Sequence, residues 1–291
     1  MQPVSTTKAT RIGICLHAYV LDQFDTAGRS LGRSRERLHS GIHEARKSIR
    51  RIRAALDLGR EKLWPDAVVV FDELRNLCRG LSLVRDAHAV VETLDRLFKQ
   101  SEDPEIRVSL RVIRKKLVNR QALGLTRFLK RDPGFRHYRT RLRCLRDSTE
   151  SLQWGVIDAV AIRSALARGE RRALRAERRA RTTRRGPLRH RWRRRLRRLR
   201  HQMMILESAL NWRFVDAASP GAHEAISIPE WSAVVGETID SLEHKADALA
   251  FEHDLRLLRS ALRTTAGIKD SDRDNTLKLV RRKIGQASRA D

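Results

Sequence analysis

The chain has 291 residues, a formal net charge of +27 and an isoelectric point near 11.4. Its hydrophobic content of 41% excludes a disordered basic tail and allows one large or two small domains with a proper core. Such a charge attracts polyanions without choosing among them. Because only 5% of the residues are aromatic, a surface that stacks nucleobases is disfavoured.

The spacing of the cysteines and the length of the apolar runs indicate the cellular compartment of the protein. Cys15, Cys78 and Cys144 are isolated, with no C-x-x-C pair, a usage typical of a reducing compartment. The apolar run from Ile12 to Leu21 is interrupted by His17 and is too short for a signal peptide or a membrane span. We therefore expect a cytoplasmic protein that is not associated with a membrane.

Helical hydrophobic periodicity dominates from end to end, and no stretch alternates convincingly as a strand. Proline and glycine punctuate the periodic segments, so the sequence predicts an all-α fold. The predicted helices span 10–30, 34–62, 65–99, 104–131, 133–152, 156–183, 187–214, 229–265 and 272–288. The connections are mostly short, so we expect consecutive helices to pack as antiparallel neighbours.

Two of these helices contain the same motif, H-x-x-R-x-x-x-R-R-x-R. The two copies are His43, Arg46, Arg50, Arg51 and Arg53, and His190, Arg193, Arg197, Arg198 and Arg200. At about 100° per residue, most members of each copy form one cationic stripe beside an apolar face. Each helix therefore presents one face to a core and the adjoining face to a negative ligand. Arginine suits that role because its planar fork binds phosphate oxygens in bidentate fashion.

Basic residues also follow one side of several other helices, and the densest run is 168–185. Charge runs of this kind usually form solvated faces. We interpret most of these residues in that way, while the run 168–185 could also be an exposed helix that anchors on any polyanion.

Four segments, taken in this order, resemble the CHAD domain, an all-helical module named for its conserved histidines. They are HEARKSIRRIRAAL at 43–56, LRNLCRGLSLVRDAHAVVETLDRL at 74–97, HRWRRRLRRLRHQMMILES at 190–208 and ADALAFEHDLRLLRSAL at 246–262. His253-Asp254 stands in the second half where Arg85-Asp86 stands in the first. No E-x-E-x-K signature precedes the helical region, so the resemblance is to the stand-alone type.

The resemblance implies a single domain over 1–291, with halves at about 10–152 and 156–288. The halves would be two four-helix bundles related by pseudo-twofold symmetry, with a basic central channel. It also implies binding of inorganic polyphosphate, without catalysis, cofactor or metal, and targeting to polyphosphate granules. The implied polyphosphate-binding residues are His43, Arg46, Lys47, Arg50, Arg51, Arg53, Arg85, His190, Arg193, Arg194, Arg197, Arg198, Arg200 and His253. Relatives often have lysine at 194, 197 and 198, a change that keeps phosphate binding.

Two rival functions stay open. The same charge would bind the backbone of RNA or DNA, although no helix-turn-helix, zinc-finger or RNP signature is present, and some adventitious binding of nucleic acid is expected. An enzyme is disfavoured because the chain has no Walker A motif and no nucleophile elbow, and because His253-Asp254 lacks a second cluster with metal-ligand spacing. The oligomeric state is not indicated.

The two motif histidines predict a pH effect. A histidine among arginines should have a depressed pKa when free and take up a proton when phosphate binds. We therefore expect the affinity for a phosphate polyanion to rise as the pH falls from about 8 to about 6.

Overall fold

A computed structural model of the chain describes residues 10–183, 185–211, 235–236 and 238–288. Within these ranges the regular structure is helical, so the prediction of an all-α fold is confirmed. The helices are α1 (Arg11–Leu31), α2 (Leu38–Leu58), α3 (Arg60–Leu63), α4 (Val68–Gly80), α5 (Ser82–Gln100), α6 (Pro104–Arg131), α7 (Arg136–Glu150), α8 (Ala159–Thr183), α9 (Gly186–Asn211), α11 (Ile239–Thr264) and α12 (Asp270–Ala287). Short 3₁₀ turns cover Arg35–Arg37, Pro133–Phe135 and Trp154–Val156. A bilayer span would need a longer apolar stretch than any of the described helices has.

Helix starts follow the expected capping chemistry. At α6, Asp103 is the N-cap, its Oδ1 accepts hydrogen bonds from the backbone N–H groups of Glu105 and Ile106 at 2.9 and 3.2 Å, and proline occupies the first helical position. At α11, the hydroxyl of Thr238 accepts from the N–H of Ser241 at 3.1 Å. These side chains satisfy backbone donors that have no partner inside the helix.

The prediction of one helix over 65–99 is wrong, because the segment bends between α4 and α5. A side chain at Gly80 would meet the hydroxyl oxygen of Tyr138 at 2.1 Å, so this position brings α7 against the bend. The Ser82 hydroxyl donates to the Cys78 carbonyl oxygen at 3.1 Å, a back-bond that bends helices. The bend directs the first turn of α5 toward α2, which contributes a guanidinium from Arg46 to the same carbonyl.

Other boundaries shift by smaller amounts. The predicted helix 34–62 is divided at Gly59 into α2 and α3, where a side chain would meet Ile157 at 2.6 Å. Of the predicted helix 229–265, the part from Ile239 to Thr264 is helical, and the described residues 235–236 and 238 precede the helix. Positions 229–234 and 237 lie outside the described residues, as do 212–214 of the predicted helix 187–214.

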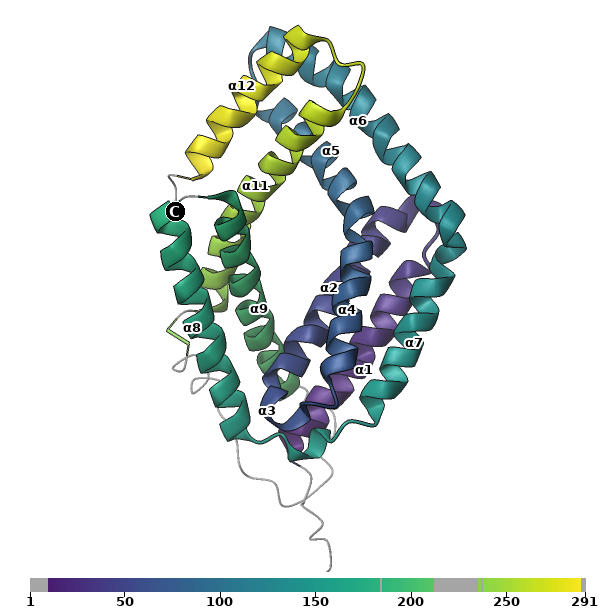
Figure 1. Cartoon of the computed structure of the whole chain (residues 1–291), viewed down its shortest axis with the longest axis vertical. Helices are drawn as coiled ribbons and strands as arrows, with labels where there is room; N and C mark the ends of the chain where they lie inside the picture. The colour runs from purple at the N-terminus through teal and green to yellow at the C-terminus, as the bar shows by residue number, and fades with distance from the viewer. Residues whose placement is uncertain (1–9, 184, 212–234, 237, 289–291) are drawn as a thin grey trace, which may run out of the picture.

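The larger of two hydrophobic cores fills the lower part of the molecule in Figure 1. It draws on α1, α2, α4, α7, α8 and α9 and on the first turns of α5 and α11. Its fully buried members include Leu16, Ile49, Leu74 and Trp192. Trp192 lies on the apolar face of α9, as its helical phase predicts.

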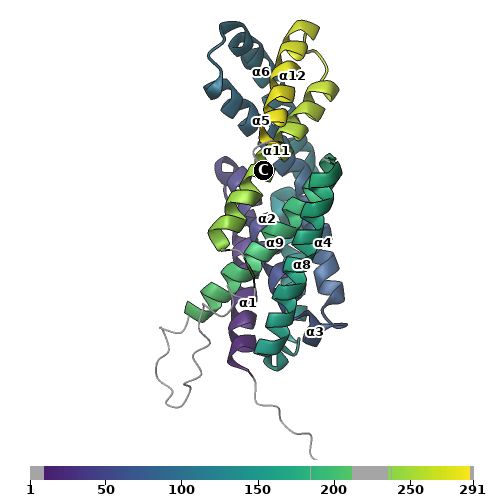
Figure 2. The same ribbon diagram turned by 90° about the vertical axis from the view of Figure 1, so that its left-hand side faces the viewer.

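The smaller core joins α5, α6, α11 and α12 in the upper part of the molecule. Leu94, Leu110, Leu258 and Val280, one from each helix, are buried at its centre. Figure 2 shows the two parts stacked along the long axis of the molecule. Helices α5 and α11 run from one core into the other.

The two cores do not follow the two halves of the sequence, since each core takes helices from both. The chain therefore folds as interleaved halves, and the pseudo-twofold relation between them stays a prediction. Most consecutive long helices do pack on each other, as the short connections predict. Helix α7 is an exception, because it packs on α1 and α4. The chain changes direction before α7 at Gly134 and Phe135, which have positive φ angles of 61° and 54°.

Candidate functional site

The candidate site lies where the two hydrophobic cores meet. Along α5, Val84 belongs to the larger core and Val90 to the smaller one. Along α11, Leu249 belongs to the larger core and Leu255 to the smaller one. The polar residues between these pairs, Arg85-Asp86 and His253-Asp254, therefore interrupt the hydrophobic interior at the same level.

Five arginines converge at this junction, and we call them the central cation cluster. They are Arg46 and Arg50 of α2, Arg85 of α5, and Arg193 and Arg197 of α9. Each lies close enough to others of the group to affect their ionisation, and the three helices come from both halves of the chain. The structure thus brings together members of both motif copies.

Two members of the cluster are fixed by hydrogen bonds. Arg46 donates from Nη1 to the carbonyl oxygen of Cys78 at 3.0 Å and also to the hydroxyl of Ser82. Arg85 donates to a carboxylate oxygen of Glu92 at 2.7 Å. These contacts orient both guanidinium groups.

The other three members have no such partner. Among the described residues, no carboxylate is paired with Arg50, Arg193 or Arg197. Burial, with the charges of Arg46, Arg193 and Arg85 acting in the same direction, lowers the pKa of Arg50 to about 10. Burial also places the pKa of Arg197 well below its ordinary value, with added repulsion from Arg50 and Arg193. The cluster is therefore a concentrated positive charge with few counter-charges.

Carboxylates on α5 and α11 offset part of the positive charge of the cluster. Asp254, Asp247 and Asp86 favour the charged form of Arg193, although burial still lowers its pKa overall. Burial raises the pKa of Asp86 and Asp254 themselves, against the pull of the arginines. These two carboxylates thus occupy the α5–α11 side of the cluster and would repel an anion there.

His43 lies at the edge of the cluster. Its Nδ1 accepts a hydrogen bond from Nε of Arg85 at 3.1 Å, so in the neutral ring the proton is on Nε2. Burial and the charges of Arg85 and Arg50 lower the pKa of His43. The imidazole is therefore neutral at pH 7 and has a fixed N–H donor.

His190 and His253 form a second imidazole group at the cluster, between α9 and α11. Their ring centroids are 4.5 Å apart with the planes tilted by 35°. Burial lowers the pKa of His190 to about 4, with help from Arg194 and Arg193. Burial together with the charge of Arg193 lowers the pKa of His253 to about 3.

Arg53 and Arg198 extend the cationic surface along α2 and α9. Their guanidinium carbons lie 4.4 and 5.6 Å from the ring centroid of Phe71 on α4. Arg198 is also 3.4 Å from a carboxylate oxygen of the buried Asp57. Burial and the charge of Arg198 lower the pKa of Arg53 to about 10.

Four residues of the expected set point elsewhere. Lys47 lies 3.9 Å from Glu44, and Arg51 lies 3.7 Å from the same carboxylate and donates to Gln23 of α1 at 3.3 Å. Arg200 is paired with Glu243 of α11. Arg194 has Arg191 and Arg198 as its charged neighbours and also acts on His190 at the edge of the central cation cluster.

Sequence reasoning missed His201, which lies one helical turn beyond Arg197. It is buried, and neither ring nitrogen has a hydrogen-bond partner in the described structure. Burial, with Arg50 and Arg197 next in effect, strongly lowers its pKa. At about 100° per residue, His201 lies on the same face of α9 as His190 and Arg197 and away from the apolar face, so its helical phase does not indicate that it is buried.

A buried ion triad was also missed. Glu252, with 1% of its surface exposed, accepts from Nε of Arg256 at 2.8 Å and from the buried Arg189 of α9. The triad fixes the start of α9 against the middle of α11, next to His253.

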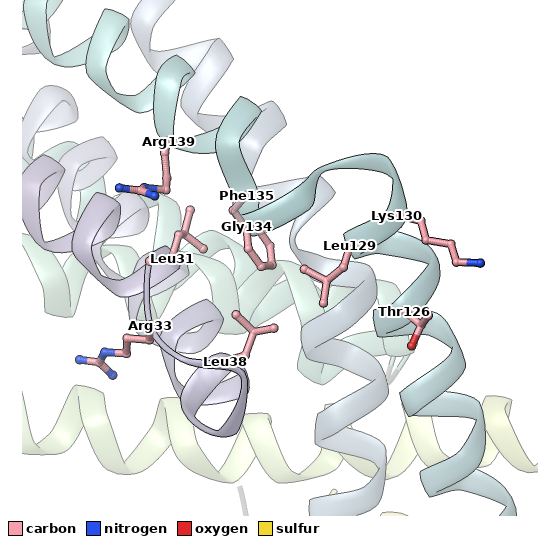
Figure 3. A pocket seen from close by; sticks show the side chains of 10 residues that line it. Leu31, Arg33, Leu38, Thr126, Leu129, Lys130, Gly134, Phe135 and Arg139 are labelled. Atoms are coloured by element: carbon pink, nitrogen blue, oxygen red, sulfur yellow. The ribbon is translucent and has the colours of Figure 1, made fainter.

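A pocket of about 300 Å³ between α5 and α11 adjoins this site, and Glu92, Asp247 and Asp254 are among its lining residues. A pocket of about 490 Å³ lies between the α1–α2 and α6–α7 connections (Figure 3), with Leu31, Leu129 and Phe135 on its inner side. Lys130 and Arg33 extend away from it on opposite sides. It shares no lining residue with the central cation cluster. No group of three or more potential metal ligands was found among the described residues.

Comparison with known proteins agrees with the fold. The family model of the CHAD domain matches residues 19–219. The crystal structure of the CHAD domain from the plant Ricinus communis is similar to this chain, with a TM-score of 0.59 and 15% identity over 98% of this chain and 88% of that one. PptA from Streptomyces chartreusis is similar with a TM-score of 0.57 and 15% identity, over 94% and 98% of the two chains. No match was found among curated proteins.

Proposed function

This chain belongs to the CHAD domain family, and we propose that its central cation cluster binds inorganic polyphosphate without transforming it. The observation that carries the proposal is the set of unpaired, mutually repelling guanidinium groups of Arg50, Arg193 and Arg197. These side chains are only partly exposed, and a partly desolvated charge without a partner is costly. An anion that enters between α2 and α9 would remove that cost.

The shape of the charge favours a chain of phosphates over a single phosphate. Arg46, Arg50 and Arg53 lie at successive turns of α2, and about seven residues of helix rise roughly 10 Å. Arg193 and Arg197 present a second series from α9. Two facing series can contact successive phosphates of one chain from two sides, and Arg85 closes the end near α5.

The aromatic residues near the site favour a ligand without bases. The ring of Phe71 is covered by Arg53 at 4.4 Å, and Trp192 has only 1% of its surface exposed. Neither ring offers the free face on which a nucleobase stacks. Polyphosphate needs no such face.

The histidines would act as adjustable donors. The Nε2–H of His43 is oriented by the hydrogen bond that Nδ1 accepts from Arg85. His190 and His253 are neutral when the site is free and can take up protons beside phosphate oxygens. Binding in this way would bring the protein to polyphosphate granules, and it needs no nucleophile or metal.

Titration calorimetry with polyphosphate of defined length tests the proposal. The site variant is Arg50→Gln/Arg197→Gln. The matched control is Arg127→Gln/Arg136→Gln, which removes the same charge from exposed positions on α6 and α7. Each titration is repeated with excess double-stranded DNA and with excess RNA, since phosphate contacts alone would bind all three polymers.

We expect polyphosphate to bind the wild type and the control with similar affinity and to resist displacement by nucleic acid. The site variant should lose at least about tenfold in affinity, which is about 1.4 kcal/mol. Equal losses in both variants, or equal displacement by DNA or RNA, would reduce the binding to a general effect of net charge and would favour a nucleic-acid function.

A further inference from the structure

A second cationic surface, separate from the central cation cluster, lies in a groove between α8 and α9. The groove has a volume of about 270 Å³ and is lined by arginines over a floor of Ala176 and Leu188. We call these residues the outer arginine groove: Arg172, Arg175, Arg179, Arg191 and Arg195. In Figure 1, α8 runs along the outer edge of the molecule, with α9 on its inner side.

The spacing of the arginines places them on one face of each helix, so both helices contribute to the groove. On α8 they occur at i, i+3 and i+7, and on α9 they are four residues apart, so each set lies on one helical face. Ala176, which is buried, is the small residue that lets the two helices approach at the floor. The run 168–185 is therefore not uniformly solvated, because one of its faces is turned toward α9.

Few carboxylates of the described residues lie near the groove. Asp57, which is buried and also lies 3.7 Å from Arg60 and 3.4 Å from Arg198, favours the charged form of Arg195. Glu177 of α8 is engaged by Arg181, whose Nη2 lies 2.8 Å away. Glu170 accepts a hydrogen bond from the N–H of Gly236 at 3.0 Å. None of the five groove arginines forms an ion pair with a described residue. Burial and the charges of Arg198 and Arg172 lower the pKa of Arg195, as expected where cations crowd together.

Helix α9 connects this groove to the central cation cluster by a continuous arc of arginines. At about 100° per residue, and with Arg193 set at 0°, the α9 arginines 197, 194, 198, 191 and 195 follow at roughly 40°, 100°, 140°, 160° and 200°. The electrostatic contacts agree with this order, since Arg191 and Arg198 both act on Arg194, and Arg198 acts on Arg195.

We propose that the outer arginine groove is a second binding site for a phosphate chain, occupied by the continuation of a polyphosphate whose other segment lies in the central cation cluster. The inference rests on the proposed function for its ligand. It adds a prediction of length selectivity, because a short chain can fill one site only while a long chain can pass around α9 and fill both. The groove lining contains no aromatic residue, which again favours a base-free chain over a nucleic acid.

The physical advantage of a second site is effective concentration. Once one segment of the chain is bound, the next segment meets the groove in an intramolecular step, and the overall affinity exceeds that of either site. More phosphate contacts also release more counterions, so the salt dependence of long-chain binding should be steeper.

The test compares two triple variants of α8 that remove the same charge. The groove variant, Arg172→Gln/Arg175→Gln/Arg179→Gln, removes the three positive charges on the α8 side of the groove. Arg163→Gln/Arg171→Gln/Arg178→Gln changes exposed positions outside it. Glutamine has nearly the helix propensity of arginine, and circular dichroism confirms that both fold. Each variant is titrated with tripolyphosphate and with a long-chain polyphosphate at several salt concentrations.

We expect the groove variant to lose at least tenfold in affinity for the long chain, with the slope of log K against log salt reduced by about 2, and to keep its affinity for tripolyphosphate. The outer control should show neither change. Equal effects of both variants on the long chain, or no effect of either, would overturn the second site. Displacement of the long chain from the groove by an equal charge of DNA would also overturn it, in favour of unspecific backbone binding.

The same titrations separate this inference from the proposed function. Loss of long-chain binding in the groove variant, while Arg50→Gln/Arg197→Gln still binds both lengths like the wild type, would refute the central site and leave the groove as the polyphosphate site. Loss of both lengths in the central variant, with no change in the groove variant, would refute the groove alone.

Discussion

Arg50 of α2 lowers the pKa of Arg197 of α9, although the two residues belong to different halves of the chain and both are only partly exposed. Like charges that face each other in a partly desolvated position are costly unless an opposite charge joins them. The relationship therefore indicates a site that is electrostatically incomplete without its ligand. It also implies that repulsion within the site lowers the free energy of unfolding of the ligand-free protein.

Removing one of these charges should stabilise the free protein while weakening binding. We expect Arg197→Met to raise the free energy of unfolding by on the order of 1 kcal/mol, which is about 2–4 °C in Tm for a chain of this size, because the repulsion within the site disappears. Polyphosphate affinity should fall at least tenfold. Thermal unfolding with and without polyphosphate measures both effects.

The matched change for that experiment is Arg200→Met on the same helix. Arg200 is paired with Glu243, so its loss should destabilise the free protein slightly and leave the affinity little changed. If Arg197→Met also destabilised the free protein, the repulsion inferred at the central cation cluster would not exist.

The buried triad around Glu252 should be essential for stability. Glu252→Gln leaves the guanidinium groups of Arg189 and Arg256 without their shared carboxylate, and breaking a buried ion pair in this way costs about 3–5 kcal/mol. Urea denaturation measures the loss. Glu243→Gln, which breaks a pair with a 43% exposed carboxylate side chain, should cost less than about 1 kcal/mol. Equal costs would contradict the structural role assigned to the triad.

Acid should destabilise the free protein through its buried histidines. The pKa values of His190 and His253 in the folded protein, about 4 and about 3, lie below the value of about 6.5 in an unfolded chain. The unfolded chain therefore binds more protons in this interval, and stability falls as the pH drops from about 6.5 toward 4. Urea midpoints at pH 7 and pH 5 measure this loss, which should shrink in His190→Asn/His253→Asn.

Binding should be linked to proton uptake by the same two histidines. Phosphate oxygens beside them raise their pKa values, so affinity should increase as the pH falls from about 6.5 to about 4. This interval is lower than the one expected from sequence, because burial lowers both pKa values further than neighbouring arginines alone. Calorimetry at pH 6 in buffers of different ionisation enthalpy counts the protons. The absence of uptake in the wild type would exclude these residues as donors to the ligand.

The helices were predictable where local signals decide them. Asp103-Pro104 predicts the start of α6 because both residues act within one turn. The bend between α4 and α5 was not predictable, since it depends on Tyr138 approaching Gly80 from another helix and on the hydroxyl of Ser82. The sharing of both cores between the halves was equally hidden, because periodicity gives an apolar face but not the helix that covers it.

The sequence predicts the types of residue at the candidate site, but only some of the individual residues that form it. The repeated motif identifies Arg50 and Arg197, whose phase on each helix places them beside the core. It cannot distinguish them from Arg51 or Arg200, since the carboxylates that pair with those two, Glu44 and Glu243, are a matter of tertiary packing. His201 was not predicted as a site residue for a related reason, because nothing in its sequence neighbourhood indicates that it is buried.

The most direct test of the account is a crystal structure of the protein with tripolyphosphate. We predict phosphate groups between α2 and α9, with oxygens within hydrogen-bond distance of Arg50 and Arg197 and with Nε2 of His43 turned toward the ligand. Phosphates found only on exposed arginines, with Arg50 and Arg197 still facing each other without an anion, would contradict the central claim.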